Sequence, residues 1–361
     1  DGAADQDTGH GTHVTGSVAG NGARSSGQFK GLGYGATVTF QAVEQYTDWS
    51  GALCAFYGLE DGYYLTGIPD DVRDLFDEAY GWGARIHNNS WGGGQAGAYD
   101  TLSVQFDDFI HQHPDMVVVT SAGNGGEDGD GDGYVDENSV TAPATAKNVI
   151  SIGASENERS SGGYQTTYGS LWPSDFPADP TRSNHVSDDR EHLAAFSSRG
   201  PLADGRIKPD VVAPGTNILS VRSSQASYDG WGSPYDQYYM YMGGTSMASP
   251  LTAGATTLVR EYYVEGEEHA SPSAALIKAT LINSAVDIGG YGNSSEEAGQ
   301  PIPNNHEGWG RVDVGAATTP GERQFVDHTG GVDTGATEPY TYSVQSSGQP
   351  FKVTLVWSDY P

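Results

Sequence analysis

The feature that most constrains this sequence is the repeated alternation of short apolar runs with amphipathic helical patterns. Residues 116–120 and 149–153 are continuous and apolar, as expected for strands that are covered on both faces. Val72, Phe76 and Ala79 recur at helical spacing and predict one buried helix face. Such alternation predicts an α/β fold with a mainly parallel β-sheet flanked by helices. The expected strands cover residues 37–43, 86–90, 116–120 and 149–153, and the expected helices cover residues 72–79, 102–110, 246–264 and 273–285.

The pattern changes near residue 318. Residues 324–326, 340–344 and 351–357 have strand-like composition, with Gly, Ser and Thr turns and no helical pattern between them. They predict the start of an antiparallel β domain, of β-sandwich or jelly-roll type, over residues 319–361. Three strands in about 40 residues do not easily close a core, so we expect this second domain to be truncated. Residues 1–318 then form the first domain.

The charge of the chain excludes two classes of partner. It has 17 Lys and Arg residues against 47 Asp and Glu residues, a formal net charge of -30. Such a surface repels phosphate backbones and anionic lipid, so we expect no nucleic-acid and no membrane partner; it attracts cations instead. The one cysteine, Cys54, excludes an intrachain disulfide framework, and its apolar neighbours predict an inert packing thiol.

Two glycine-flanked segments carry reactive residue types, GHGTHVTG at residues 9–16 and GGTSMASP at residues 243–250. His10 lies where a loop enters a helix, so its ring is expected to be accessible. Ser246 lies at the start of a helix, where free N–H groups and the helix dipole favour a developing negative charge. Taken singly, a serine here is usually an N-cap and a loop histidine is usually solvated.

Together the two segments resemble the His and Ser motifs of the subtilisin-like serine proteases. The resemblance implies that His10 is the general base, that Ser246 is the nucleophile and that His13 is a structural histidine of the same helix. Ala248 stands where the last glycine of a Gly-x-Ser-x-Gly elbow would be. This disfavours a serine esterase of the α/β-hydrolase type.

Between the His and Ser motifs lie further segments that resemble those of the family and follow the same order along the chain. SAGNG at residues 121–125 resembles the oxyanion-hole segment, which implies that Asn124 donates its side-chain N–H to the oxyanion beside the backbone N–H of Ser246. NNSWGG at residues 88–93 resembles the edge strand that pairs with substrate backbone, and Trp91 is expected to narrow a subsite there. The implied substrate-binding residues are Ser90, Trp91, Gly92, Ala122 and Gly123. Residues 352–359 are similar to the β domain that follows the protease domain in one alkaline-protease subgroup.

One member of the family's catalytic triad has no counterpart in this sequence. The resemblance implies an aspartate at the end of a strand several dozen residues before the histidine, but only nine residues precede His10. Asp5 and Asp7 are too close to His10 and have no strand before them, so we interpret them as part of the loop. We therefore expect a processed or truncated N-terminus and a missing N-terminal segment that completes the fold.

An acidic insertion follows Asn124, with the sequence DGDGDGYVD at residues 128–136. Oxygen ligands at positions 1, 3, 5 and 9, a backbone carbonyl at position 7 and Gly at position 6 reproduce most of an EF-hand-type calcium loop. Position 12 is Ser139 rather than Glu, and Glu137 is the candidate replacement; the alternative is a solvated acidic loop. The expected calcium ligands are Asp128, Asp130, Asp132, Tyr134 and Asp136.

The sequence therefore predicts a secreted, calcium-stabilised serine endopeptidase that cleaves peptide bonds through a Ser246 acyl-enzyme. The alternative is a non-catalytic, calcium-stabilised binding or scaffold protein that keeps the same fold. The missing aspartate favours this alternative, whereas the intact His10, Asn124 and Ser246 set argues against it. The long insertion over residues 162–191 receives no assigned role.

Overall fold

The computed structural model describes residues 5–49, 51, 58–289, 300–320, 323–328, 330–344, 348 and 351–361. Cys54 lies outside the described residues, so its packing role stays a prediction. No helix in the described part of the chain is both long and apolar enough to cross a membrane.

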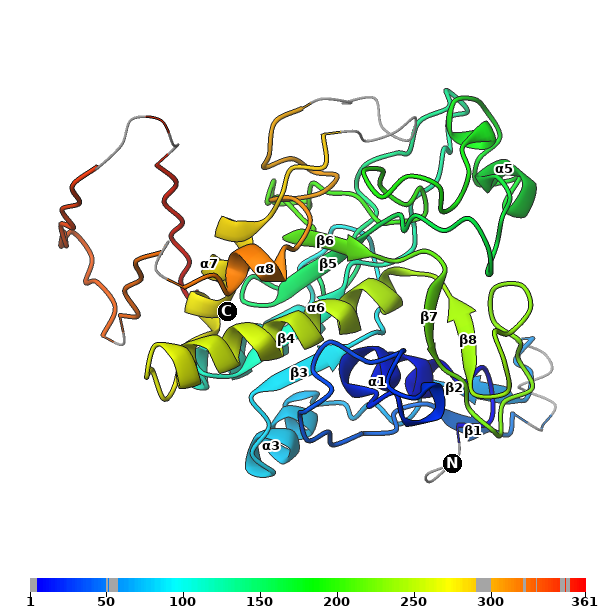
Figure 1. Ribbon diagram of the computed structural model, residues 1–361, viewed down its shortest axis with the longest axis horizontal. Coiled ribbons are helices and arrows are strands. Elements are labelled where there is room, and N and C mark those ends of the chain that lie inside the picture. Colours follow the sequence, from blue (N-terminus) through cyan, green and yellow to red (C-terminus); the bar gives the residue numbers. More distant parts are fainter. Residues whose placement is uncertain are drawn as a thin grey trace.

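A four-stranded parallel sheet lies at the centre of the molecule (Figure 1). Its strands run in the order β3 (Ile86–Asn89), β4 (Val117–Ser121), β5 (Ile150–Ser155) and β6 (Val211–Pro214). Every residue of β4 and β5 is buried. Burial on both faces explains why these strands are apolar without alternation, and it confirms the predicted α/β class.

The longest helix, α6, packs against all four strands of this sheet and crosses it in Figure 1. Helix α1 packs on α6, and α3 packs on α4 through an edge-to-face contact of Phe76 with Phe106. The predicted helices at residues 72–79, 102–110, 246–264 and 273–285 are confirmed within a few residues, except that α6 changes into a π-helical turn after residue 261. The helices are α1 (His10–Ala19), α3 (Arg73–Gly81), α4 (Thr101–Gln112), α5 (Tyr168–Leu171), α6 (Thr245–Glu261), α7 (Ala274–Ser284) and α8 (Val314–Ala317), with 3-10 turns at Ala23–Ser25 and Thr181–Ser183 and the π turn at Tyr262–Gly266.

Two small antiparallel pairs flank the central sheet. Strands β1 (Gln45–Thr47) and β2 (Gly62–Tyr64) form one pair, and β7 (Ile218–Val221) and β8 (Tyr239–Met242) form the other. Helix α1 packs on β7, so the second pair supports the helix that carries His10. Local patterning did not predict either pair.

The strand expected over residues 37–43 is not formed. These residues have no hydrogen-bonded strand partner in the described part of the chain, and a cavity separates them from β3. Val38 and Phe40 are 43% and 58% exposed. A strand is stabilised by its cross-strand hydrogen bonds, so β-rich composition alone does not produce one here.

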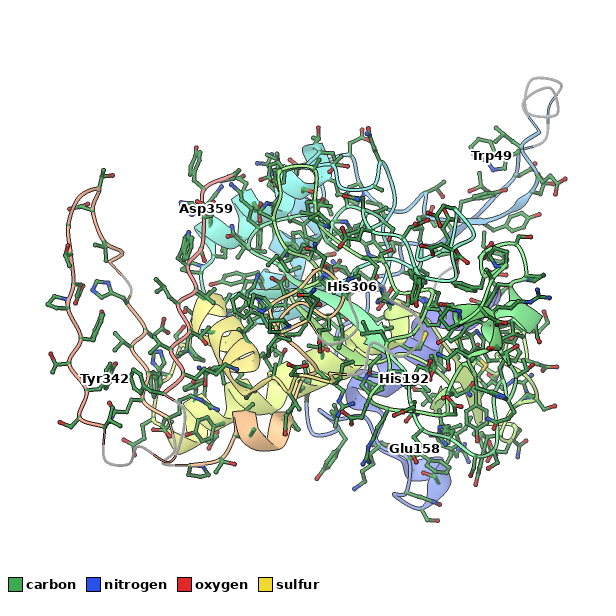
Figure 2. The ribbon with its side chains drawn as sticks, turned by 90° about the horizontal axis from the view of Figure 1, so that it is seen from above. Trp49, Glu158, His192, His306, Tyr342 and Asp359 are labelled. Carbon is green, nitrogen blue, oxygen red and sulfur yellow. The ribbon has the colours of Figure 1, made fainter. Side chains whose placement is uncertain are left out.

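The three strands expected after residue 318 are also absent from the described residues. Residues 330–344 form an arm to one side of the domain, with Tyr342 well out from its surface (Figures 1 and 2). Leu355 and Trp357 are 78% and 65% exposed, because no paired strand covers them. Near the end of the chain, Asp359 and Asn148 exchange two hydrogen bonds of 2.7 and 2.8 Å. The division into domains at residue 318 stays a prediction.

Candidate active site

His10, Asn124 and Ser246 line one cavity of about 1520 Å³. His10 is the first residue of α1, and Ser246 is the second residue of α6. Asn124 follows β4, whose carboxyl end lies beside that of β3 in the parallel sheet. The structure therefore brings together the three residues that the sequence predicted to be catalytic, from segments far apart in the chain.

Ser246 is half-buried at the first turn of α6. The N-cap position is Gly244, with φ of 135°, so Ser246 is not an ordinary capping residue. Its Oγ donates to the Ser90 carbonyl at 3.2 Å rather than to the His10 ring, and Ser90 Oγ donates to the Ser246 carbonyl at 3.0 Å. These two bonds fix the start of α6 against the end of β3.

Asn124 is exposed to the cavity and is held by its side-chain oxygen. That oxygen accepts hydrogen bonds from the Thr245 backbone N–H at 2.8 Å and from Thr245 Oγ at 3.0 Å. Because both donors lie at the helix terminus, they determine which end of the amide faces α6. The Asn124 Nδ2 group lies near Gly244, two residues before Ser246: a Cβ on Gly244 would be 3.3 Å from it.

The two histidines of α1 have different environments. Burial lowers the pKa of His10 and the negative charge of Asp5 partly opposes this, so burial favours the neutral form of the ring. Asp5 itself accepts two hydrogen bonds of 2.8 Å from the N–H and hydroxyl of Thr12, which supports its interpretation as part of the loop. Across the described ranges, no carboxylate hydrogen-bonds to the His10 ring. His13 is fully buried, with Nε2 3.0 Å from the Ile218 carbonyl, and burial lowers its pKa to about 4.

The predicted substrate-binding residues divide into two groups. Ser90, Trp91, Gly92 and Gly123 line the cavity. Ala122 does not: it is fully buried, its N–H donates to the Ile152 carbonyl at 2.9 Å and its carbonyl accepts from the Thr141 N–H at 3.3 Å. The role of Ala122 stays a prediction, but Ile152 of β5 and the Thr141 loop already occupy its backbone groups.

Trp91 has one side against the protein and another toward the cavity. It is half-buried, and its ring packs edge-to-face on Phe106 at 6.1 Å. The same residue lines the cavity beside Ser90. Its packing holds the ring at the wall, where it can restrict the side chain of a bound substrate.

The same cavity extends along the outer edge of β3. Residues 36–44 form one wall and residues 83–88 the other. Gln41 Oε1 and His87 Nε2 join the two walls at 3.0 Å. β3 is an edge strand of the sheet, so its outer backbone groups have no strand partner in the part of the chain described above. The cavity therefore lies where one further strand could pair with β3.

The acidic loop gathers part of its expected ligand set. One carboxylate oxygen from each of Asp128, Asp130 and Asp132 lies within 4.8 Å of the others. Asp128 is buried, and its Oδ1 atom has no hydrogen-bond partner. Asp136 is not in this group, because its Oδ2 atom accepts from the Gly129 N–H at 2.8 Å. Three carboxylates and an unpaired buried oxygen fit a cation that takes oxygen ligands.

Two further positions of this loop can be compared with the sequence. Gly133 has φ of 95°, and a Cβ there would lie 1.9 Å from the Asp179 carbonyl oxygen, so glycine is required as predicted. Glu137 does not replace the missing ligand at position 12: its Oε1 atom accepts from Asn305 Nδ2 at 3.1 Å. Asn305 holds this side chain outside the three-aspartate cluster.

The chain matches one protein family over most of its length. Residues 1–310 match the subtilase family, Peptidase_S8. The chain belongs to the subtilase family. It is 30% identical over 351 residues to the serine protease/ABC transporter B family protein tagD of Dictyostelium discoideum, covering 78% of this chain and 18% of that protein. It is 31% identical to the serine protease AprX of Bacillus subtilis, covering 70% of this chain and 48% of that protein.

Solved structures agree with this subtilase fold. The CspB protease of Clostridium perfringens matches with a TM-score of 0.55 and 18% identity, covering 86% of this chain and 79% of that one. Sphericase matches with a TM-score of 0.53 and 19% identity, also over 86% and 79%. This subtilase chain spans between about a fifth and a half of the two sequence relatives named above.

Proposed function

We propose that this subtilase chain is the peptidase part of a secreted serine endopeptidase that hydrolyses peptide bonds. The observation that carries the proposal is the joint position of His10, Asn124 and Ser246 on one cavity. Their arrangement suits acyl transfer, which needs a nucleophile, a base and a donor for the oxyanion. The proposed substrates are proteins or peptides.

In the proposed reaction, His10 takes the proton of Ser246 Oγ as that oxygen attacks the carbonyl carbon of the scissile peptide bond. The carbonyl oxygen becomes an oxyanion, which Asn124 Nδ2 and the Ser246 backbone N–H stabilise. When the C–N bond breaks, His10 gives its proton to the leaving amine and the acyl group stays on Ser246. Water then gives a proton to His10 as its oxygen attacks the acyl carbon. The bond to Ser246 Oγ breaks, the acid product leaves, and His10 returns the proton to Ser246 Oγ.

The backbone of Ser90, Trp91 and Gly92 supports the proposed binding of an extended substrate. These residues leave the end of β3 and line the cavity beside Ser246. Backbone pairing at such an edge gives affinity with little dependence on substrate sequence. Trp91 then limits the size of the substrate side chain that faces it.

We also propose that a further β-strand, from a segment preceding Asp1, fills the groove between residues 36–44 and β3. The exposed Val38 and Phe40 side chains and the unpaired edge of β3 support this proposal. By the family resemblance, that strand would bring the carboxylate that holds the His10 ring. Without it, no carboxylate of the described residues hydrogen-bonds to the imidazolium formed during acylation, and only the charge of Asp5, which is bonded to Thr12, acts on the ring.

For the acidic loop we propose a structural calcium ion held by Asp128, Asp130 and Asp132, with the Tyr134 carbonyl and Asp136 completing the set. The unpaired Oδ1 of Asp128 supports the ion. Because the Gly129 N–H already bonds to Asp136 Oδ2, Oδ1 is the oxygen through which Asp136 would complete the set. An acidic loop that is only solvated is the competing interpretation.

The second candidate function is a calcium-stabilised binding or scaffold protein without catalysis. The absence of a carboxylate hydrogen bond to His10 in the described chain favours it. The ordered contact of Asn124 with Thr245 argues against it, because a binding protein has no need to orient this amide toward an oxyanion.

A fluorophosphonate probe distinguishes the two functions in protein that contains the preceding segment. We expect the probe to label the peptide containing Ser246 and to inhibit peptide hydrolysis. Ser246→Ala should abolish both effects, whereas Ser170→Ala, at an exposed serine of α5, should retain both. Labelling of another serine, together with full activity of Ser246→Ala, would contradict the proposal.

A further inference from the structure

A second cluster of metal-ligating side chains lies apart from the acidic loop, at the end of β5. Glu156 directly follows β5, whereas Asp188 lies near the far end of the long insertion and His192 directly follows it. One carboxylate oxygen of Glu156, one of Asp188 and one ring nitrogen of His192 lie within 4.8 Å of one another. Figure 2 shows His192 on the same side of the molecule as Glu158.

The backbone holds Glu156 and His192 next to each other. The Glu156 N–H donates to the His192 carbonyl at 2.8 Å. The following residue, Leu193, forms an antiparallel bridge with Ser155, the last residue of β5. The two ligand candidates are therefore fixed by the carboxyl end of β5, an inner strand of the central sheet.

Two atoms of this cluster are buried and have no hydrogen-bond partner, Glu156 Oε2 and His192 Nδ1. The Glu156 residue is completely buried. Its other carboxylate oxygen, Oε1, accepts from the Tyr168 hydroxyl at 3.0 Å and from Asn184 Nδ2 at 3.4 Å. Buried polar atoms without partners are rare in folded proteins, and each one calls for a ligand or a water.

A carboxylate beside His192 favours the tautomer in which Nδ1 can bind a metal ion. Asp189 Oδ2 lies 3.4 Å from His192 Nε2 and favours a proton on that nitrogen. The lone pair is then on Nδ1, the atom without a partner. A carboxylate behind a ligating histidine is a common arrangement around bound metal ions, because it fixes the tautomer and orients the ring.

The charge balance also favours a cation. Burial raises the pKa of Glu156 well above its usual range, and the charge of Asp188 adds to this effect. The Tyr168 hydroxyl, which donates to Oε1, and the nearby N–H groups of Asp188 and Asp189, which form no hydrogen bond of normal geometry with Oε2, offset only part of it. A divalent cation would compensate both carboxylates at once.

We propose that Glu156, Asp188 and His192 bind a divalent transition-metal ion, with Zn²⁺ as the best fit, and that this ion joins the two ends of the insertion. One nitrogen and two carboxylate ligands suit Zn²⁺, with water in the remaining position, whereas Ca²⁺ prefers oxygen ligands throughout. The ion gives the long insertion a structural attachment to β5. The site is separate from the three-aspartate cluster and does not depend on the proposed catalysis.

The test uses the full chain in a Ser246→Ala background, which prevents self-digestion, with calcium in excess to fill the acidic loop. We expect titration with Zn²⁺ to reveal one further site and to raise the melting temperature by a few degrees when Zn²⁺ exceeds its dissociation constant about 100-fold. Co²⁺ in place of Zn²⁺ should give a visible absorption band from a site with a nitrogen ligand.

Variants identify the ligands. His192→Ala and Glu156→Gln should each weaken Zn²⁺ binding at least about tenfold and remove the Co²⁺ band. Glu158→Gln, at an exposed carboxylate two residues away, should retain both, as should Asp128→Asn with Asp132→Asn. His192→Ala changes a half-buried ring, so it tests the site even if Glu156→Gln fails to fold. Absence of Zn²⁺ binding, or unchanged binding in His192→Ala, would overturn the proposal.

Discussion

The side-chain oxygen of Asn124 accepts a 2.8 Å hydrogen bond from the backbone N–H of Thr245, the residue before Ser246. The proposed oxyanion donor and the proposed nucleophile are thus held to one helix terminus. Thr245 Oγ adds a 3.0 Å bond to the same oxygen and also accepts from the Gly123 N–H at 3.3 Å. Thr245 is therefore a positioning residue that connects the end of β4 with the start of α6.

The contact between Asn124 and Thr245 predicts that replacing either residue lowers kcat, but by different factors. Asn124→Ala should lower kcat about 10²- to 10³-fold with little change in KM, as for the oxyanion-hole donor of the related subtilisin. Thr245→Val keeps the N–H bond but loses the hydroxyl bonds, so its kcat should fall by a smaller factor. Steady-state kinetics on a peptide substrate, with the preceding segment present, measure both effects.

The matched control for Thr245→Val is Thr257→Val. It alters a threonine of the same helix whose hydroxyl donates to the Ala253 carbonyl. Its kcat should be close to that of the unmodified protein. A loss in Thr257→Val equal to that in Thr245→Val would show that the effect arises from helix stability rather than from Asn124.

The groove beside β3 predicts that residues 1–361 alone are a poor catalyst. The ring of His10 lacks a carboxylate partner in the described chain, and the related subtilisin loses about 3 × 10⁴ in kcat without its aspartate. We expect a comparable or larger deficit here, because the outer edge of β3 is also unpaired in the described chain, and Val38 and Phe40 across the groove are exposed. Peptidase assays before and after addition of the preceding segment as a peptide measure the deficit.

The control peptide carries Asn in place of the aspartate that is expected to face His10. It should bind the groove and raise the melting temperature while restoring little activity. Full activity of residues 1–361 without any added segment would contradict the prediction and would require another carboxylate near His10.

The acidic loop predicts a melting temperature that depends on calcium. A ligand that binds only the folded protein stabilises it by mass action, so EDTA should lower the melting temperature. Asp128→Asn combined with Asp132→Asn removes two of the three clustered carboxylates and should remove part of this response. Asp333→Asn, at an exposed position outside the loop, should leave it unchanged. An undiminished EDTA response in the double variant would mean that the stabilising calcium lies elsewhere.

Buried His13 predicts a loss of stability in mild acid. Its pKa is about 4 in the folded protein against an ordinary value of 6.5, so the unfolded chain binds more protons between these values. The contribution is present above pH 6.5 and is lost as the pH falls toward 4, at a cost of about 3 kcal/mol. Urea unfolding of the Ser246→Ala protein across this range measures the slope.

His13→Gln should reduce the slope of the unfolding free energy against pH, because about one proton fewer is taken up on unfolding. The slope that remains includes the contribution of the buried His306, whose pKa is about 3. Thr101→Ala, at an exposed and uncharged position of α4, serves as the control and should leave the slope unchanged. Equal slopes in the His13 and Thr101 variants would contradict the assignment.

Local sequence was sufficient for the central elements and for the positions of His10 and Ser246 at the starts of two helices. The apolar runs at residues 116–120 and 149–153 became β4 and β5 within two residues, because burial on both faces leaves a continuous apolar pattern. The glycine-rich motifs around His10 and Ser246 likewise predicted two residues at helix starts that line one cavity. These features depend on near neighbours in the chain.

Pairing and side-chain contacts over long separations required the tertiary structure. Residues 37–43 have strand composition but no strand, because the adjacent sheet position is open. Ala122 matches a binding motif, yet Ile152 and Thr141 occupy its backbone groups. Both outcomes follow from which segments pack together, which no local pattern encodes.

The same reason applies to the contacts that refine the site. The Asn124–Thr245 bond joins residues 121 positions apart, and Glu156 meets His192 only because the end of the insertion returns to β5. The sequence contained the residue types for this chemistry, in motifs read from a few adjacent positions. Distances and unpaired buried atoms exist only after the chain has packed, so the structure alone decided which of those residues act together.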